Sequence, residues 1–129
     1  MKKLGLTLAM AVVNTVAWAG WVEIGSNESG TFYVDPPSMQ RTGDIVKMWY
    51  LIDFKTIQVD NSTRPFLSTK DHSEYDCKEA RARTIYYNNY SGPMGRGKIT
   101  FTLKDPLKWR QPETGTIAST LLKIACGKK

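Results

Sequence analysis

The pattern of apolar and polar positions predicts a chain made mainly of β-strands. Short β-branched and aromatic runs alternate with clusters of Ser, Asn, Gly and Pro, which favour turns. The first two runs, 21–25 and 31–35, are separated by a turn-like segment and predict a hairpin. The segment 45–54 carries apolar side chains at both odd and even positions, which is typical of a strand covered on both faces. We expect it to be the central strand.

Three more strands are expected, at 66–73, 75–87 and 98–103. A polar segment at 55–65, which ends in proline, predicts a loop or a distorted edge after the central strand. The last strand alternates cleanly. Its predicted inward face consists of Ile99, Phe101 and Leu103.

The strand predicted at 75–87 contains a conflict of register. Strict alternation places Cys77 on the same face as Arg81 and Arg83, so that two arginines would follow the cysteine toward the core. A β-bulge near Lys78 would shift the register and remove the conflict. Alternatively, carboxylates at the rim of the sheet would hold the two arginines. The sequence favours the bulge.

A single helix is predicted near the C-terminus. Thr114 or Thr116 is expected as its N-cap, and Gly127 as its C-cap directly after Cys126. Its apolar stripe at helical spacing consists of Ile117, Ala118, Leu121, Leu122, Ile124 and Ala125. The predicted fold class is therefore α+β, a small antiparallel sheet of about six strands with one C-terminal helix packed on it.

The N-terminal segment is typical of a signal peptide. Two lysines are followed by an apolar run at 4–16 and by a small-x-small motif at 17–19. The run is shorter than the roughly 17 to 25 residues that a membrane-spanning helix needs. We therefore expect a signal peptide at 1–19, a single domain at 20–129, and no transmembrane segment after cleavage.

The two cysteines of the chain, Cys77 and Cys126, are expected to form a disulfide. Export places them in an oxidising compartment, where a pair of cysteines is a disulfide by default. A catalytic or metal-binding pair would need companions, but the chain has one histidine, His72, and no Cys-x-x-Cys motif. The bond would tie the helix to the sheet.

The formal net charge of +6 favours acidic partner surfaces and is too small to indicate nucleic acid. A protein or an acidic surface is the expected partner. Exposed basic and aromatic residues in and after the Gly-rich connection 90–97 and around Trp109 are the candidates, because Arg and aromatic residues often anchor interfaces. These candidate binding residues are Arg96, Lys98, Lys104, Lys108, Trp109 and Arg110.

No catalytic site is predicted. His72 lies beside Asp71 and near Glu74, a juxtaposition that could in principle provide a general base. No nucleophile context, metal-ligand spacing or pair of catalytic carboxylates accompanies it. We therefore expect a protein that is not an enzyme, with no catalytic residue, no metal site and no cofactor.

A series of motifs follows the signal segment. The motifs are, in order, Tyr33-Val34-Asp35, Val46-Lys47-Met48-Trp49, Glu74-Tyr75-Asp76-Cys77, Arg81-x-Arg83, Tyr90-Ser91-Gly92-Pro93-Met94-Gly95, Trp109, Pro112 and Cys126. This series resembles the surface-adhesin protein E family of bacterial exported proteins. The block from 75 to 97 is its most specific part, and the likeness covers nearly all of the chain after the signal segment. The resemblance implies an antiparallel sheet with a helix fastened by a disulfide.

For function, the resemblance implies surface lipoproteins that bind host extracellular-matrix and plasma proteins and that can form homodimers. Those members carry a lipid-anchored cysteine where this sequence has Ala19-Gly20. Two functions are therefore expected. One is an adhesin-like, non-enzymatic binding protein; the other is a soluble, envelope-associated protein of the same fold without a host ligand. The expected location is the periplasm, with the cell surface and the medium as alternatives.

Overall fold

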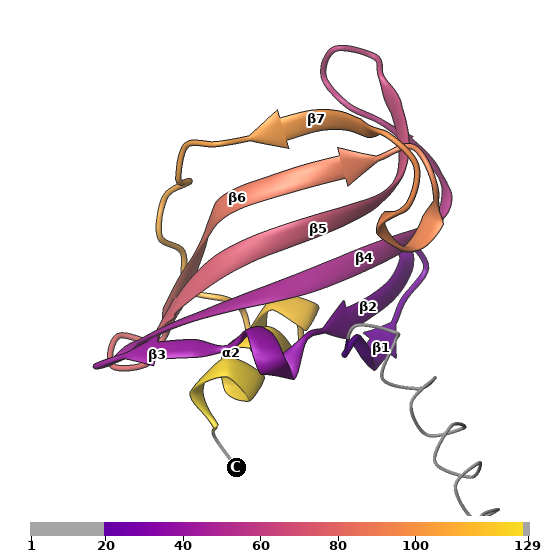
Figure 1. Cartoon of the computed structure of the whole chain (residues 1–129). Coiled ribbons are helices and arrows are strands. Elements are labelled where there is room, and N and C mark those ends of the chain that lie inside the picture. The colour runs from indigo at the N-terminus through magenta and orange to yellow at the C-terminus, as the bar shows by residue number, and fades with distance from the viewer. Residues whose placement is uncertain (1–19, 128–129) are drawn as a thin grey trace, which may run out of the picture.

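The structure, a computed structural model, describes residues 20–127, and the signal peptide expected at 1–19 lies outside this range. Seven strands form one antiparallel sheet in the order β1-β2-β4-β5-β6-β7, and β3 pairs with the first part of β4 (Figure 1). The strands are β1 (Val22–Ser26), β2 (Gly30–Val34), β3 (Gln40–Thr42), β4 (Ile45–Val59), β5 (Pro65–Asp76), β6 (Arg81–Tyr90) and β7 (Ile99–Leu103). The other elements are the 3-10 helices η1 (Pro36–Ser38) and η2 (Pro93–Gly95) and the helix α2 (Ile117–Cys126). The predicted α+β fold and the hairpin formed by β1 and β2 are confirmed.

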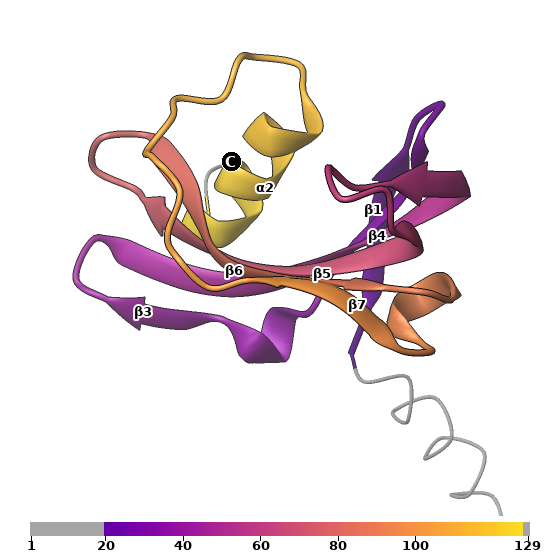
Figure 2. The same ribbon diagram turned by 90° about the horizontal axis from the view of Figure 1, so that it is seen from above.

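Helix α2 lies on one face of the sheet (Figure 2). Thr116 is its N-cap, because the side-chain Oγ1 accepts a hydrogen bond from the backbone N–H of Ser119 at 3.2 Å. Gly127 ends the helix with a φ of 70°, a conformation that glycine adopts without strain. The buried residues at the centre of the core come from β2, β4, β5 and α2. They are Val34, Val46, Met48, Tyr75, Leu121 and Ala125.

The predicted disulfide between Cys77 and Cys126 is present, with 5.6 Å between the two Cα atoms. Cys77 follows the end of β5, and Cys126 is the last residue of α2. The bond therefore closes the C-terminal end of the helix onto the end of the β5–β6 hairpin.

The prediction of one strand at 75–87, with a bulge near Lys78, is wrong. Tyr75 and Asp76 end β5, and the chain turns before β6 begins at Arg81. The Oδ1 atom of Asp76 accepts hydrogen bonds from the backbone N–H groups of Lys78 and Glu79, each at 3.1 Å. These bonds hold the turn and, led by the one from Glu79, keep the pKa of Asp76 below its usual value.

The two arginines are held by carboxylates, which is the alternative that the sequence did not favour. Nε of Arg81 lies 3.0 Å from Oδ2 of Asp76, and Nε of Arg83 lies 2.8 Å from Oε1 of Glu74. Each pair joins directly facing positions of β5 and β6. The register conflict disappears because Cys77 lies in the turn, outside the alternating strand.

The segment 55–65, which was predicted as a loop or a distorted edge, contains more strand than a loop would have. β4 continues to Val59 after a register shift, and β5 begins at Pro65, so the two strands form an arm that extends beyond the sheet (Figure 1). Ile57 and Val59 on this arm are 64% and 60% exposed. The segment is polar because the arm is exposed to solvent and does not pack against the core.

The inward face predicted for the last strand is wrong at Ile99, which is 54% exposed. β7 is the edge strand and pairs only with the second half of β6. The short strand β3, which the sequence did not indicate, consists of exposed residues and follows η1. The strand predicted at 98–103 is present as β7. β3 has no buried face from which a sequence pattern can be recognised.

Candidate functional site

The predicted binding residues form two separate groups. Arg96 and Lys98 lie before β7, and the other four residues lie after it. A five-residue strand spans roughly 17 Å, so the two groups lie at opposite ends of β7. The second group belongs to residues 104–116, which connect β7 to α2 and are called the strap below.

The strap runs along the first half of β6 and rises to the helix (Figure 2). The backbone N–H of Leu107 donates to the carbonyl of Thr84 at 2.8 Å. Ala82 and Arg110 exchange two backbone hydrogen bonds, each of 2.9 Å. The strap therefore occupies the edge of β6 that β7 leaves unpaired, and its position is set by the sheet.

On the outer side of the strap, Trp109 contacts both arginines of β6. The guanidinium carbons of Arg81 and Arg83 lie 4.7 and 4.5 Å from the centre of the ring. This distance is that of a cation–π contact. Trp109 is half-buried in this contact.

The strap has an excess of positive charge. Within residues 20–127, no carboxylate forms an ion pair with Lys104, Lys108 or Arg110, and all three side chains are exposed. Together with the paired arginines around Trp109, they form a basic and aromatic surface, called the strap patch below. Its members are Arg81, Arg83, Lys104, Lys108, Trp109 and Arg110. Sequence reasoning assigned no binding role to the two β6 arginines, although their i, i+2 spacing places them on one face of a strand.

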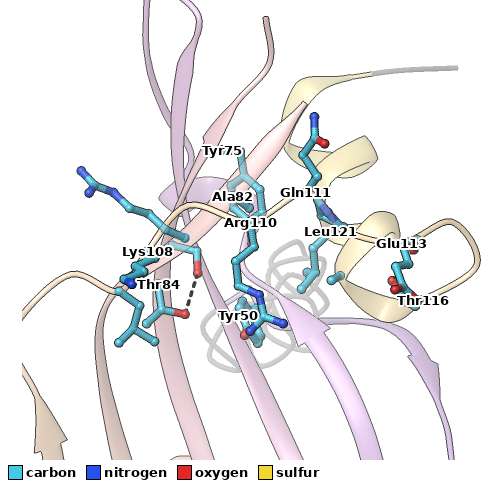
Figure 3. Close-up of a pocket in the computed structure, with 15 residues that line it drawn as sticks. Tyr50, Tyr75, Ala82, Thr84, Lys108, Arg110, Gln111, Glu113, Thr116 and Leu121 are labelled. Atoms are coloured by element: carbon cyan, nitrogen blue, oxygen red, sulfur yellow. Dashed lines mark hydrogen bonds between the residues drawn. The ribbon is translucent and has the colours of Figure 1, made fainter. Parts of the chain in front are cut away.

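On the inner side of the strap lies a cavity of about 570 Å³, called the strap cavity below (Figure 3). It is bounded by the strap, by the start of α2 and by the helix-bearing face of β4, β5 and β6. Three members of the strap patch, Arg83, Lys108 and Arg110, also line the cavity, whereas Trp109 does not. These three basic residues therefore belong to both the patch and the cavity, and Trp109 belongs to the patch alone.

A buried carboxyl group underlies the cavity floor. Asp71 is 5% exposed; its Oδ1 accepts from the hydroxyl of Ser73 at 2.6 Å, and its Oδ2 accepts from that of Thr84 at 2.9 Å. Burial raises the pKa of Asp71 to about 6, although the hydrogen bonds from Ser73, Thr84 and Tyr50 oppose the shift. Burial, followed by the nearby charge of Asp71, raises the pKa of Tyr50 well above its usual value.

His72 and Asp71 point to opposite faces of the sheet and do not form a catalytic pair. Asp71 faces Tyr50 across the β4–β5 ladder, whereas His72 faces Trp49. The imidazole stacks on the indole of Trp49, with 4.5 Å between ring centres. Burial lowers the pKa of His72. The general-base arrangement considered from the sequence is therefore not assembled.

The described residues define a small disulfide-tied α+β domain with a basic, aromatic edge and an open cavity beside it. Within residues 20–127, no group of three or more His, Cys, Asp or Glu side chains is placed to hold a metal ion. In the same range, no helix is long and apolar enough to cross a membrane.

Comparison with known proteins identifies the family. The profile of the surface-adhesin protein E family matches residues 21–127, so the chain belongs to this family. A structure of Haemophilus influenzae protein E is similar, with a TM-score of 0.59 and 15% identity, over 86% of this chain and 89% of that one. A second crystal form of that protein has a TM-score of 0.61 and 14% identity, over 85% of this chain and 91% of that one. A crystal structure of protein E from non-typeable Haemophilus influenzae has a TM-score of 0.60 and 14% identity, over 84% of this chain and 76% of that one.

At these identities the structural likeness establishes the fold. No curated protein sequence matches the chain. The family and the fold together define an adhesin-like protein of the exported class.

Proposed function

We propose that this protein is an exported, non-enzymatic binding protein of the adhesin type, and that the strap patch contacts an anionic protein partner. The observation that carries the proposal is the contact of Trp109 with Arg81 and Arg83, next to three basic side chains that have no ion-pair partner within residues 20–127. Extracellular-matrix and plasma proteins of the host are the proposed partners.

The physical basis is preorganisation. The strap is hydrogen-bonded to β6, and the two arginines are held by Asp76 and Glu74, so little conformational entropy is lost when a partner binds. Arg and Trp are among the residues that contribute most to binding energy at interfaces. The flanking basic side chains attract an acidic partner and increase the association rate.

Arg96 and Lys98 provide a second, independent cationic surface before β7. We keep it as a proposed contact region that acts separately from the strap patch. A partner protein that contacts both surfaces would need a large interface, whereas a smaller partner would contact the strap patch alone.

An adhesin must be exposed on the cell surface, so the location of the protein tests the proposed function. Intact cells expressing the protein are treated with a protease, and the protein is followed by immunoblot with a known periplasmic protein as the internal control. Loss of this protein while the control survives is the expected result for an adhesin. Survival of both would place the protein in the periplasm and would remove binding of host proteins as its function.

A further inference from the structure

The strap cavity has the properties of a preformed ligand site. Its volume of about 570 Å³ lies within the range of roughly 300 to 1,000 Å³ found for small-molecule sites. Two of its walls are fixed, because the strap is hydrogen-bonded to β6 at Ala82 and Thr84, and the far end of α2 is tied by the disulfide. A ligand would therefore enter without a rearrangement of the backbone.

The floor of the cavity offers one hydrogen-bond acceptor. Ser73 and Thr84 line the cavity, and each donates its single hydroxyl hydrogen to the carboxylate of Asp71. Ser73 and Asp71 are 4% and 5% exposed, so a ligand meets neither of them. Thr84 is half-buried, and its hydroxyl oxygen keeps a lone pair for a ligand. Ligand groups that donate hydrogen bonds, such as hydroxyls or an amide N–H, fit this floor.

The walls and the mouth add two further requirements. Tyr75, Leu107 and Leu121 line the cavity. Tyr75 and Leu121 are 2% and 4% exposed, so the apolar side chain that a ligand meets is Leu107, which is 47% exposed and suits the C–H face of a sugar ring. Lys108 and Arg110 line the cavity and lack an ion-pair partner within the described residues. In Figure 3 both extend from the strap above the floor. They suit a carboxylate, which arginine binds through two parallel hydrogen bonds.

We infer that the strap cavity binds an acidic sugar, with a hydroxyl of the sugar on Thr84 and its carboxylate on Lys108 and Arg110. The inference deepens the proposed function and rests on it in part, because Lys108 and Arg110 also belong to the strap patch. Two sources could supply this chemistry: an acidic sugar of an extracellular glycan, or the lactyl-bearing sugar of a bacterial cell wall.

Titration calorimetry of the full mature chain at pH 7.5 tests the inference with two matched pairs of probes. Glucuronic acid is compared with glucose, and N-acetylmuramic acid with N-acetylglucosamine, so that each pair differs mainly by a carboxylate. We expect the acid of at least one pair to bind, and its neutral partner to bind at least about tenfold more weakly. Preference for glucuronic acid indicates a glycan source, and preference for N-acetylmuramic acid a cell-wall source.

Two variants test the site. Ala118→Leu places a larger side chain in the cavity from an exposed helix position and removes no hydrogen bond, so binding should be abolished while Tm is retained. Arg110→Gln should weaken binding of the acid about tenfold and leave the neutral sugar unchanged. Arg41→Gln, the same charge change on the exposed strand β3, serves as the matched control.

The inference is overturned if neither acid binds at millimolar concentration, if acid and neutral sugar bind equally, or if Ala118→Leu binds as the wild type does. Its failure is distinguishable from that of the proposed function. Ala118→Leu leaves the outer side of the strap intact, so this variant should still capture a protein partner through the strap patch.

Discussion

The guanidinium carbon of Arg83 lies 4.5 Å from the centre of the Trp109 ring, and the same arginine forms an ion pair with Glu74. One side chain thus connects β5, β6 and the strap. Trp109 belongs to a segment without regular secondary structure. The contact with Arg83 therefore helps to fix the positions of Lys108 and Arg110, which flank Trp109. The relationship between Arg83 and Trp109 is therefore both structural and, in our proposal, functional.

A double-mutant cycle of Arg83→Met and Trp109→Leu measures this relationship. We expect a coupling free energy of about 0.5–1 kcal/mol, the size of a cation–π contact at a partly exposed site. The measurement is the free energy of unfolding of the four proteins in urea. Strict additivity of the two single substitutions would show that the contact does not hold the strap.

Replacing both Cys77 and Cys126 by Ser should lower the free energy of unfolding by about 4 kcal/mol. The two residues are 49 positions apart, and the bond removes the closure entropy of that loop from the unfolded chain. Equilibrium denaturation in urea, compared with the wild type under oxidising conditions, provides the measurement. A loss below about 1 kcal/mol would mean that the sheet and helix remain together without the bond.

Asp71 should make the protein more stable as the pH falls from about 7.5 to about 4. Its folded pKa of about 6 lies above the unfolded value of 3.8, so the folded state takes up the proton first. The stabilisation is complete below the unfolded pKa and is lost as the pH rises through the folded pKa. His72, whose pKa is lowered by burial, has the opposite effect in the same range.

Comparison of Asp71→Asn with the wild type isolates this effect, since His72 contributes equally to both. The stability of the variant relative to the wild type should be greatest at pH 7.5 and should decrease by about 2–3 kcal/mol on lowering the pH to 4. Urea denaturation at a series of pH values measures the difference. A difference that is constant with pH would contradict the assignment of a raised pKa to Asp71.

Those parts of the fold that bury a regular pattern could be predicted from the sequence. The continuous apolar run of β4 identified the central strand, and the stripe of α2 with Gly127 after it identified the helix and its end. The disulfide followed from the count of cysteines and the expected compartment. In each case a single feature of the sequence was sufficient to predict the element or the bond.

The β5–β6 turn could not be predicted, because it contains no Gly, Pro or Asn. The side chain of Asp76 supplies the hydrogen bonds that hold it, and Ala80 adopts a φ of 54°. The strap cavity could not be predicted either, since Tyr50, Thr84 and Leu121 are distant in the sequence and meet only in the folded chain. The separation of the candidate binding residues into two groups also depends on the fold, because β7 lies between Lys98 and Lys104.

Affinity for partner proteins, measured on charge-reversed variants, tests the central claim most directly. The wild type, Lys104→Glu/Lys108→Glu, Arg96→Glu/Lys98→Glu and the control Lys55→Glu/Arg41→Glu are applied to immobilised extracellular-matrix and plasma proteins, with heparin as a polyanion reference. The three double variants carry the same change in net charge, and their Tm values establish that they are folded.

If the strap patch is the binding surface, the Lys104→Glu/Lys108→Glu variant should bind at least about tenfold more weakly, while the control binds as the wild type does. The Arg96→Glu/Lys98→Glu variant reports whether the second surface also contributes. Equal affinity of the strap variant and the wild type, or an equal loss in the strap variant and the control, would contradict a binding function for the strap patch.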